Sequence, residues 1–526
     1  MKKISRILLA VATGLALVSC NDLLNIDQHG VIPTSGFYDT DEGTTEAITA
    51  LYDQFSQNLT DFYGRSPIRL KELLSDDVYS GGGVRNDNVN QERLNEYQFD
   101  YTNTLIANAY KGLYEVIYKA NLILNNVEDN SAIKKQAINE AKVFRALSYI
   151  DLVTLWGTPP LVTEAVRDDY KAPNSTPAEI WSLIEQDLTE ALDSKTLAQK
   201  KSVDDKLTGI RITTQFAQAL LGKAYVYEGK YAEALPLLES VIKSGLYDFL
   251  DNYGNYSVAA YNNNSEILFS NYVLNDSSRG TSTGIYPWTC IGLSSNFLNG
   301  VYTNTLDYGT GGFNFLPPSQ SIIAAFKANE PDSKRFKQTF KSYSDLLSGG
   351  LSLKEGLTYY ANCGYWNYKY RPARSSMTTN GWGYAYYTNV SVMKLSEVVL
   401  LAAECAIRTK GDGAGDTYIN MIRTKAGVPA KTGCTLEDLK LEKRLECYMD
   451  GTRYYDLVRW GDAAKALADQ GKEVMGFSLD ANGNEVVKAQ FTNSSYGWKS
   501  GKHDLLPFPE EEMNVNPNMK QNKGWE

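Results

Sequence analysis

Histidine is almost absent from this chain of 526 residues, which has only His29 and His503. A Ser-His-Asp triad or a multi-histidine metal site would have to be built around one of two residues that lie near opposite ends of the chain, so we expect neither. Cysteine is also scarce, with six residues and no Cys-x-x-Cys spacing. The sequence therefore predicts no zinc cluster, no disulfide scaffold and no cofactor.

Positive charge is in short supply as well. The chain has 52 Lys and Arg residues against 62 Asp and Glu residues, which gives a net charge of −10. A nucleic-acid partner needs clustered Lys and Arg, so we expect no binding to nucleic acid. Long apolar runs are missing after the first twenty residues, and no later stretch is long enough to cross a bilayer.

The one apolar run lies at the N-terminus. A basic start is followed by apolar residues from Ile7 to Val18 and then by Ser19-Cys20. This order predicts a secretory signal over residues 1–19, too short for a membrane span. The ending Leu17-Val18-Ser19-Cys20 resembles a bacterial lipobox, which implies cleavage before Cys20 and attachment of acyl chains such as palmitate to it. The alternative is an ordinary signal peptide with an incidental cysteine. Lipid on Cys20 would hold the protein on a membrane outside the cytoplasm.

Aromatic residues are abundant, with 36 tyrosines and 8 tryptophans. The C–H-rich face of a sugar stacks on an aromatic ring, while its hydroxyl groups form hydrogen bonds at the ring edge. The composition is therefore typical of a surface that binds carbohydrate.

Amphipathic helical patterns dominate the chain outside its middle third. Apolar residues recur at spacings of three and four over Thr44–Gln57, Ile106–Asn126 and Ile133–Trp156. Another helix is predicted to begin at Thr176-Pro177, with Thr176 as the N-cap and Pro177 in the first turn.

The clearest pattern is that of a tetratricopeptide unit at Thr213–Gly245. Small residues at Gly222, Ala224 and Ala234 allow two antiparallel helices to touch. A weaker related unit lies at Lys394–Gly427. One such pair cannot bury its own apolar face, so two distant units indicate one stacked scaffold with a long insertion.

We therefore predict a mainly α fold, a tetratricopeptide-like helical superhelix with a few short β-hairpins. The helical scaffold is expected over about 36–270 and 391–470, within a single body at 20–526. The insertion at about 271–390 is rich in Gly, Asn, Ser and aromatic residues, and only Ser319–Ala328 keeps a helical pattern. The C-terminal segment 471–526 is irregular, apart from a hairpin predicted at Phe477–Val487 around Asn482-Gly483.

Three stretches together resemble one family. They are AKVFRALSYIDLVTLWGTPPLV at 141–162, LEKRLECYMDGTRYYDLVRWG at 441–461 and LLPFPEEEMNVNPNMKQNKGW at 505–525. With the lipobox, these stretches are similar to the SusD/RagB family of Bacteroidetes outer-membrane lipoproteins. The resemblance implies a non-catalytic, surface-exposed glycan-binding protein. Such proteins sit on a SusC-like TonB-dependent transporter and deliver oligosaccharides or polysaccharide fragments to it.

The resemblance also implies two ligand-binding residues. Trp288, two residues before Cys290, lies where the family's starch binder has a stacking tryptophan. Tyr79 follows a Glu-Leu-x-x-Asp stretch, here Glu72–Asp76, after which the family places a second contact. Tyrosine stands there in place of tryptophan, so the resemblance does not imply that the ligand is the same as that of the starch binder.

Four further residues are candidates for ligand binding. Tyr286 lies beside Trp288 in the same loop, and Arg65 can donate hydrogen bonds to hydroxyl groups. Trp366 and Trp382 are candidates on composition alone. The alternative for all these rings is packing within the loops, because large rings are usually mostly buried.

Two other functions are considered. Glu442 and Glu446 are four residues apart on one helix face, so a surface glycoside hydrolase is conceivable. The resemblance places them in the scaffold, where a structural ion network is expected, and the same choice applies to Glu140, Arg145 and Asp151. The second alternative is a helical-repeat scaffold that binds peptides or proteins.

Overall fold

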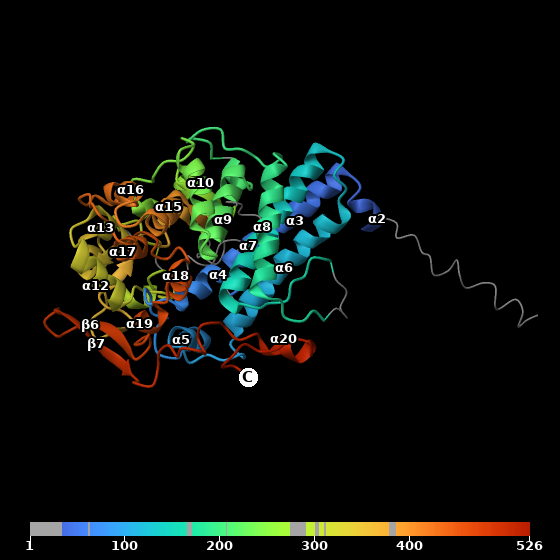
Figure 1. Ribbon diagram of the computed structural model, residues 1–526. Helices are drawn as coiled ribbons and strands as arrows, with labels where there is room; N and C mark the ends of the chain where they lie inside the picture. The colour runs from blue at the N-terminus through green and yellow to red at the C-terminus, as the bar shows by residue number, and fades with distance from the viewer. Residues whose placement is uncertain are drawn as a thin grey trace, which may run out of the picture.

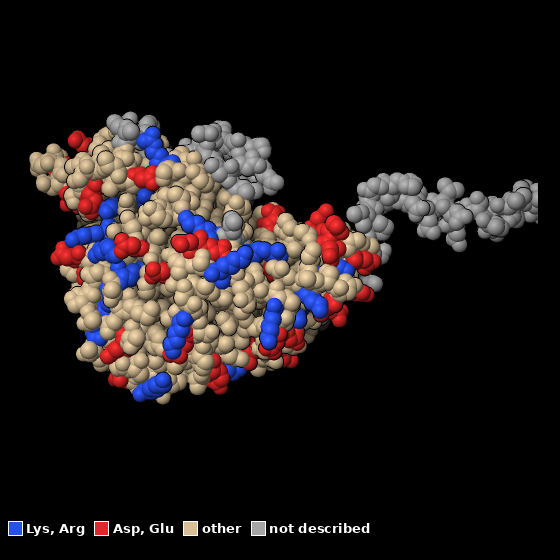
Figure 2. All heavy atoms as spheres, turned by 90° about the horizontal axis from the view of Figure 1, so that it is seen from above, with Lys and Arg blue, Asp and Glu red and all other residues tan. Residues whose placement is uncertain are grey.

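The computed structural model describes residues 34–61, 64–165, 171–206, 208–273, 291–299, 304–309, 312–377 and 386–526. Helices make up about half of the described residues and strands are short; the hairpin of β6 (Glu473–Leu479) and β7 (Glu485–Thr492) lies near one end of the body (Figure 1). The mainly α prediction is confirmed. Acidic and basic side chains are interspersed over the face shown in Figure 2, with broad uncharged areas between them.

The N-terminal part of the scaffold is helical. The helices of this part are α2 (Thr34–Phe37), α3 (Asp41–Thr60), α4 (Pro67–Leu73), α5 (Val89–Asn95), α6 (Thr104–Asn126), α7 (Ala132–Trp156) and α8 (Pro177–Asp193). The longest of them, α3, α6, α7 and α8, pack side by side. The predicted helices correspond to α3, α6 and α7. At the start of α8, Thr176 and Glu179 form the reciprocal hydrogen bonds of a capping box, which confirms the predicted N-cap.

The tetratricopeptide unit is formed by α9 (Thr214–Tyr227) and α10 (Tyr231–Ile242), and the weaker unit by α15 (Leu395–Lys410) and α16 (Asp416–Ala426). Gly222 meets Leu238 so closely that an added Cβ would lie 2.8 Å from the leucine Cδ2. Helices α10 and α15 pack against each other. The two units, distant in sequence, therefore stack as predicted.

The insertion begins and ends at one strand pair. Strands β1 (Ile267–Ser270) and β5 (Ser391–Lys394) are antiparallel, with Ile267 opposite Lys394. Between them lie α12 (Gln320–Asn329), α13 (Lys334–Thr339), β2 (Phe340–Ser342), α14 (Tyr343–Ser348), β3 (Thr358–Tyr360) and β4 (Tyr365–Asn367). Helix α12 matches the predicted Ser319–Ala328. Helices α13 and α14 and the β2–β4 pair were not predicted.

The C-terminal part contains α17 (Leu436–Glu446), α18 (Arg453–Trp460), α19 (Ala463–Ala466), β6 (Glu473–Leu479), β7 (Glu485–Thr492) and α20 (Glu510–Val515). Strands β6 and β7 form the predicted hairpin, and β3 of the insertion adds a third strand beside β6.

The end of the chain packs against early helices. Trp156 Nε1 donates a hydrogen bond of 2.9 Å to the carbonyl oxygen of Pro507, and the ring of Trp525 stacks on Phe99 at 5.1 Å. His503 is buried in the same aromatic group, and its Nδ1 accepts a hydrogen bond from the backbone N–H of Lys499. Burial lowers the pKa of His503 to about 3, so the ring is neutral at physiological pH.

Candidate functional site

Tyr79, one of the two ligand contacts implied by the resemblance, lies mostly inside the protein. Its residue is 9% exposed, and its ring packs with Tyr360, Ala361 and Val474. Its backbone N–H donates to Pro317 at 2.9 Å, which ties the loop to the insertion. The ring therefore offers a ligand at most an edge, and in this structure its main role is packing.

Trp366 lies deeper still. It is 3% exposed in β4, with its ring edge-on to Phe477 at 5.4 Å and to Tyr359 at 6.3 Å. No face of the indole is open to a sugar, so the structure favours the packing alternative for this residue. A single tryptophan in the sequence carries no signal for which of these roles it has.

Arg65 is partly exposed, but it already has an acidic partner. Its Nη1 lies 2.8 Å from Glu115 Oε2, and 33% of its side chain is exposed. Gln54 donates a hydrogen bond to the same carboxylate oxygen. A ligand hydroxyl would have to share the guanidinium with Glu115.

The remaining predicted residues lie outside the described residues. These are Trp288 and Tyr286 in the segment 274–290, Trp382 in the segment 378–385, and the lipidation residue Cys20. Their assignments stay predictions.

A hollow of about 540 Å³ runs beside α3 and is the best-formed candidate for a binding site. Aromatic rings line it, with Phe55 and Phe269 stacked at 5.7 Å and Tyr272 48% exposed. Polar side chains of Asp53 and Arg211 also line it. An apolar surface with a few polar groups is the usual make-up of a small-molecule site.

The backbone around Tyr272 is fixed from both sides. Asn271 Oδ1 accepts a hydrogen bond of 2.6 Å from the backbone N–H of Val390, and Asn271 Nδ2 donates to Ser56 Oγ at 3.1 Å. Asn389 Oδ1 accepts from the backbone N–H of Val273 at 3.0 Å. The backbone that carries Tyr272 is therefore fixed before any ligand arrives, which lowers the entropy cost of ordering it on binding.

Charge at the hollow is balanced. Arg211 Nη2 lies 2.7 Å from Glu140 Oε2, and burial raises the pKa of Glu140 although Arg211 opposes the shift. Tyr52 accepts a hydrogen bond from the backbone N–H of Ile212 at 2.8 Å. The hollow thus has no strong net charge and suits a neutral ligand.

Sequence reasoning did not find this hollow. Tyr272 lies one residue past the predicted start of the insertion, and a Tyr flanked by Asn271 and Val273 is not distinctive in a chain with 36 tyrosines. The usable signal was its position at the boundary of the scaffold and the insertion, since loops on a rigid scaffold often carry function.

The paired carboxylates Glu442 and Glu446 are structural. Arg335, which is fully buried, lies 2.7 Å from Glu442 Oε1 and 3.1 Å from Glu446 Oε2. Lys425 lies 2.7 Å from the other oxygen of Glu446. Burial raises the pKa of Glu446, but Lys425 and Arg335 lower it by more, so the carboxylate is ionised and closed off from any substrate. The predicted ion network is confirmed.

The second charged group from the sequence, Glu140, Arg145 and Asp151, also forms structural ion pairs. Arg145 pairs with Asp187 at 2.8 Å, Arg211 with Glu140, and Lys71 with Asp151 at 2.8 Å. The described residues hold no group of three or more His, Cys, Asp or Glu side chains placed to bind a metal ion. None of the described helices has the length and apolar character that a membrane span requires.

Comparisons with known proteins agree with this fold. The family model described as "SusD family" matches residues 265–525, and the model described as "Starch-binding associating with outer membrane" matches residues 38–227. SusD-like protein P25 of Formosa agariphila is 25% identical, with 98% of this chain and 97% of that protein covered.

Two solved structures show the same architecture. A laminarin-binding SusD-like protein is 26% identical with a TM-score of 0.75, covering 91% of this chain and 98% of its own. Surface glycan-binding protein A from Bacteroides thetaiotaomicron, in complex with laminarihexaose, is 20% identical with a TM-score of 0.72, covering 92% of this chain and 99% of its own. The second likeness shows the shared fold alone.

Proposed function

Because the chain belongs to the SusD family, we propose that it is a cell-surface glycan-binding lipoprotein that captures oligosaccharides and delivers them to a SusC-like TonB-dependent transporter in the outer membrane. One observation carries most weight: the likeness to the laminarin-binding protein extends over 91% of the chain with a TM-score of 0.75. The protein captures its ligand without catalysis. Neither a hydrolase nor a peptide-binding scaffold has a specific observation in its favour.

The ligand is a neutral glycan, bound at the hollow beside α3. The exposed ring of Tyr272, on its fixed backbone, provides a stacking surface, and Asp53 and Arg211 provide hydrogen bonds to hydroxyl groups. Trp288 remains the second stacking residue of the proposal, on the family resemblance alone. Stacking contributes most of the binding free energy, since sugar hydroxyls exchange bonds with water for bonds with protein at little net gain.

Calorimetric titration with laminarin and starch oligosaccharides tests the site. Trp288→Ala and Tyr272→Ala should each weaken binding by about 1–3 kcal/mol, roughly one to two decades in affinity. Tyr118→Ala is the matched control, because Tyr118 is 47% exposed on α6 and does not line the hollow. Equal affinity in Tyr272→Ala and the control would place the site elsewhere. No binding of any glycan by the wild type would contradict the function itself.

Two experiments on membranes test the rest of the proposal. Cys20→Ala should release the protein from the outer membrane, because Cys20 is the proposed lipid attachment site. Gentle detergent extraction of the wild type should bring a large barrel transporter with it, because a protein that covers the mouth of the transporter contacts it over a broad surface. A variant that stays membrane-bound would contradict lipidation, and recovery of the protein alone in several mild detergents would contradict the transporter partnership.

A further inference from the structure

Glu72 in α4 has one satisfied and one unsatisfied carboxyl oxygen. Its Oε1 accepts a hydrogen bond from the backbone N–H of Gly451 at 2.5 Å. Its Oε2 is buried and has no hydrogen-bond partner in the part of the chain that the structure describes. The whole residue is 2% exposed. A buried polar atom without a partner is destabilising and rare in folded proteins, so this oxygen calls for an explanation.

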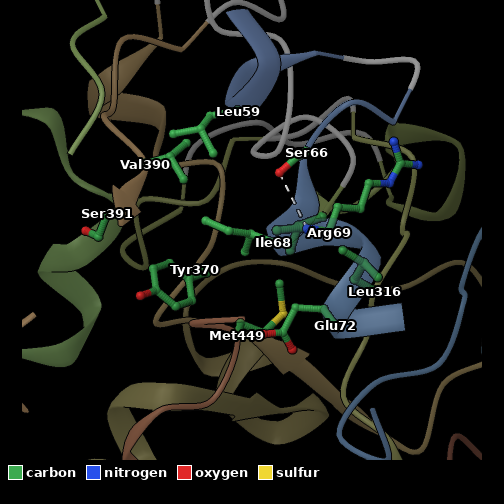
Figure 3. Close-up of a pocket in the computed structure, with 11 residues that line it drawn as sticks. Leu59, Ser66, Ile68, Arg69, Glu72, Leu316, Tyr370, Val390, Ser391 and Met449 are labelled. Atoms are coloured by element: carbon green, nitrogen blue, oxygen red, sulfur yellow. Dashed lines mark hydrogen bonds between the residues drawn. The ribbon is translucent and has the colours of Figure 1, made fainter. Parts of the chain in front are cut away.

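A small cavity lies next to this carboxyl group (Figure 3). Its volume is about 40 Å³, and a water molecule needs roughly 10–15 Å³ by the same measure. Ile68 of α4 lines it together with Leu316 and Val390 of the insertion and Met449. Ser66, whose Oγ accepts the hydrogen bond drawn from the Arg69 N–H, adds a hydroxyl group.

Glu72 forms no salt bridge with any described residue; Arg69 lines the same cavity but donates to Gln91 Oε1 at 3.0 Å. Of the acidic groups that act on Glu72, Asp77 pairs with Arg444 at 2.8 Å, and Asp450 pairs with Lys394 at 2.5 Å and with Lys369 at 3.4 Å. Burial is the main cause that raises the pKa of Glu72; the Gly451 N–H and Lys369 lower it, Asp77 and Asp450 raise it, and the net pKa is about 8. A carboxylic acid that keeps its proton has to donate it.

We propose that the cavity is a binding site for one or two water molecules and that Glu72, as an uncharged carboxylic acid, donates the proton on Oε2 to them. Through Gly451 on one oxygen and the water on the other, Glu72 connects α4 and the residue 449–451 turn to the inner face of the insertion. The site takes water because it is too small for a sugar ring, and the protonated Oε2 of Glu72 needs an acceptor. It is separate from the proposed glycan site.

Crystals of the wild-type protein near pH 6.5 test the water directly. Density for water should lie within hydrogen-bond distance of Oε2, and xenon under pressure should not enter the cavity, since apolar gas occupies dry cavities. Xenon in the cavity, or Oε2 bonded to a cation, would overturn the proposal.

The proton is tested by pH. An unfolded Glu ionises near its ordinary pKa of 4.5, whereas the folded residue keeps its proton to about pH 8. Unfolding therefore releases a proton between these values, so wild-type stability should fall as pH rises through this window. Glutamine cannot ionise, so the Glu72→Gln variant should not lose stability in this way. The folding equilibrium constant of Glu72→Gln, divided by that of the wild type, should rise roughly a thousandfold between the two pH values.

Glu437→Gln is the control, because the Glu437 side chain is 79% exposed. The folding equilibrium constant of Glu437→Gln, divided by that of the wild type, should not change with pH in this window. Infrared difference spectra of wild type against Glu72→Gln near pH 6.5 should also show one protonated carboxyl band, which needs no unfolding. A flat ratio for Glu72→Gln, or no such band, would show that Glu72 is ionised in the folded protein.

Discussion

Helices α6 and α7 of the scaffold run for 23 and 25 residues, whereas α12, the longest described helix of the insertion, has 10. Side-chain N-caps occur in both regions, at α6 and α7 and also at α12, α13 and α14, whereas α10, α15 and α16 have none. Positive φ angles in residues other than glycine also occur in both regions, at Asp307, Asn314, Leu316 and Ala361 in the insertion and at Asn86, Tyr97, Lys195, Asn263 and Met449 outside it. Helix length is what separates the two regions, because a long helix shows its apolar period within its own sequence while a short one depends on its neighbours.

The ion network around Arg335 joins the two regions. Arg335 lies in α13 of the insertion, while Glu442 and Glu446 lie in α17 of the scaffold. Arg335→Met should lower the free energy of unfolding by about 3–5 kcal/mol, because it leaves the buried Glu330 without its ion-pair partner and takes one cation each from Glu442 and Glu446. Denaturant unfolding followed by circular dichroism measures the loss.

Lys337→Met on the same helix is the matched control. Lys337 is 61% exposed in its side chain and pairs with Asp332 at 3.4 Å, so its loss should change stability by less than about 0.5 kcal/mol. Equal effects of the two variants would mean that the network does not hold the insertion to the scaffold.

A smaller effect is expected inside the scaffold, at the contact between α9 and α10. Gly222→Leu should destabilise the protein by about 1–3 kcal/mol, because the new side chain overlaps Leu238. Thermal unfolding measures the change. Gly36→Leu in α2 is the control, since no atom lies within 4 Å of its added Cβ. An undisturbed melting temperature in Gly222→Leu would show that the two helices can move apart freely.

The smallest effect is expected from a local capping signal. Thr176→Ala removes the side chain that caps α8 and should cost about 1 kcal/mol. Thr424→Ala, in the interior of α16, should be neutral or slightly stabilising, because alanine favours helix more than threonine does. Chemical denaturation of both variants checks the difference. If Thr176→Ala lowered the free energy of unfolding as much as Arg335→Met, a local cap would stabilise the protein as strongly as a tertiary ion network, and the contrast would be lost.

The same contrast explains what could be predicted from the sequence. The scaffold helices were found because their apolar period and their caps lie within a few neighbouring residues. Helices α13 and α14 have six residues each, too few to show a period, and α13 depends on Arg335 reaching a distant helix. The burial of Tyr79 and Trp366 depends on partners far along the chain, Val474 and Phe477, so the ring type alone could not distinguish a stacking platform from core packing.

The packing of Trp525 against Phe99 and His503 has a consequence for how the protein is made. A chain synthesised from its N-terminus cannot complete the core around Phe99 and Trp156 until residues 505–525 have left the ribosome. Contacts between residues so far apart in sequence form late in folding. For a chain with the export signal predicted here, this part of the core would stay open while the chain is exported, until its last residues complete it.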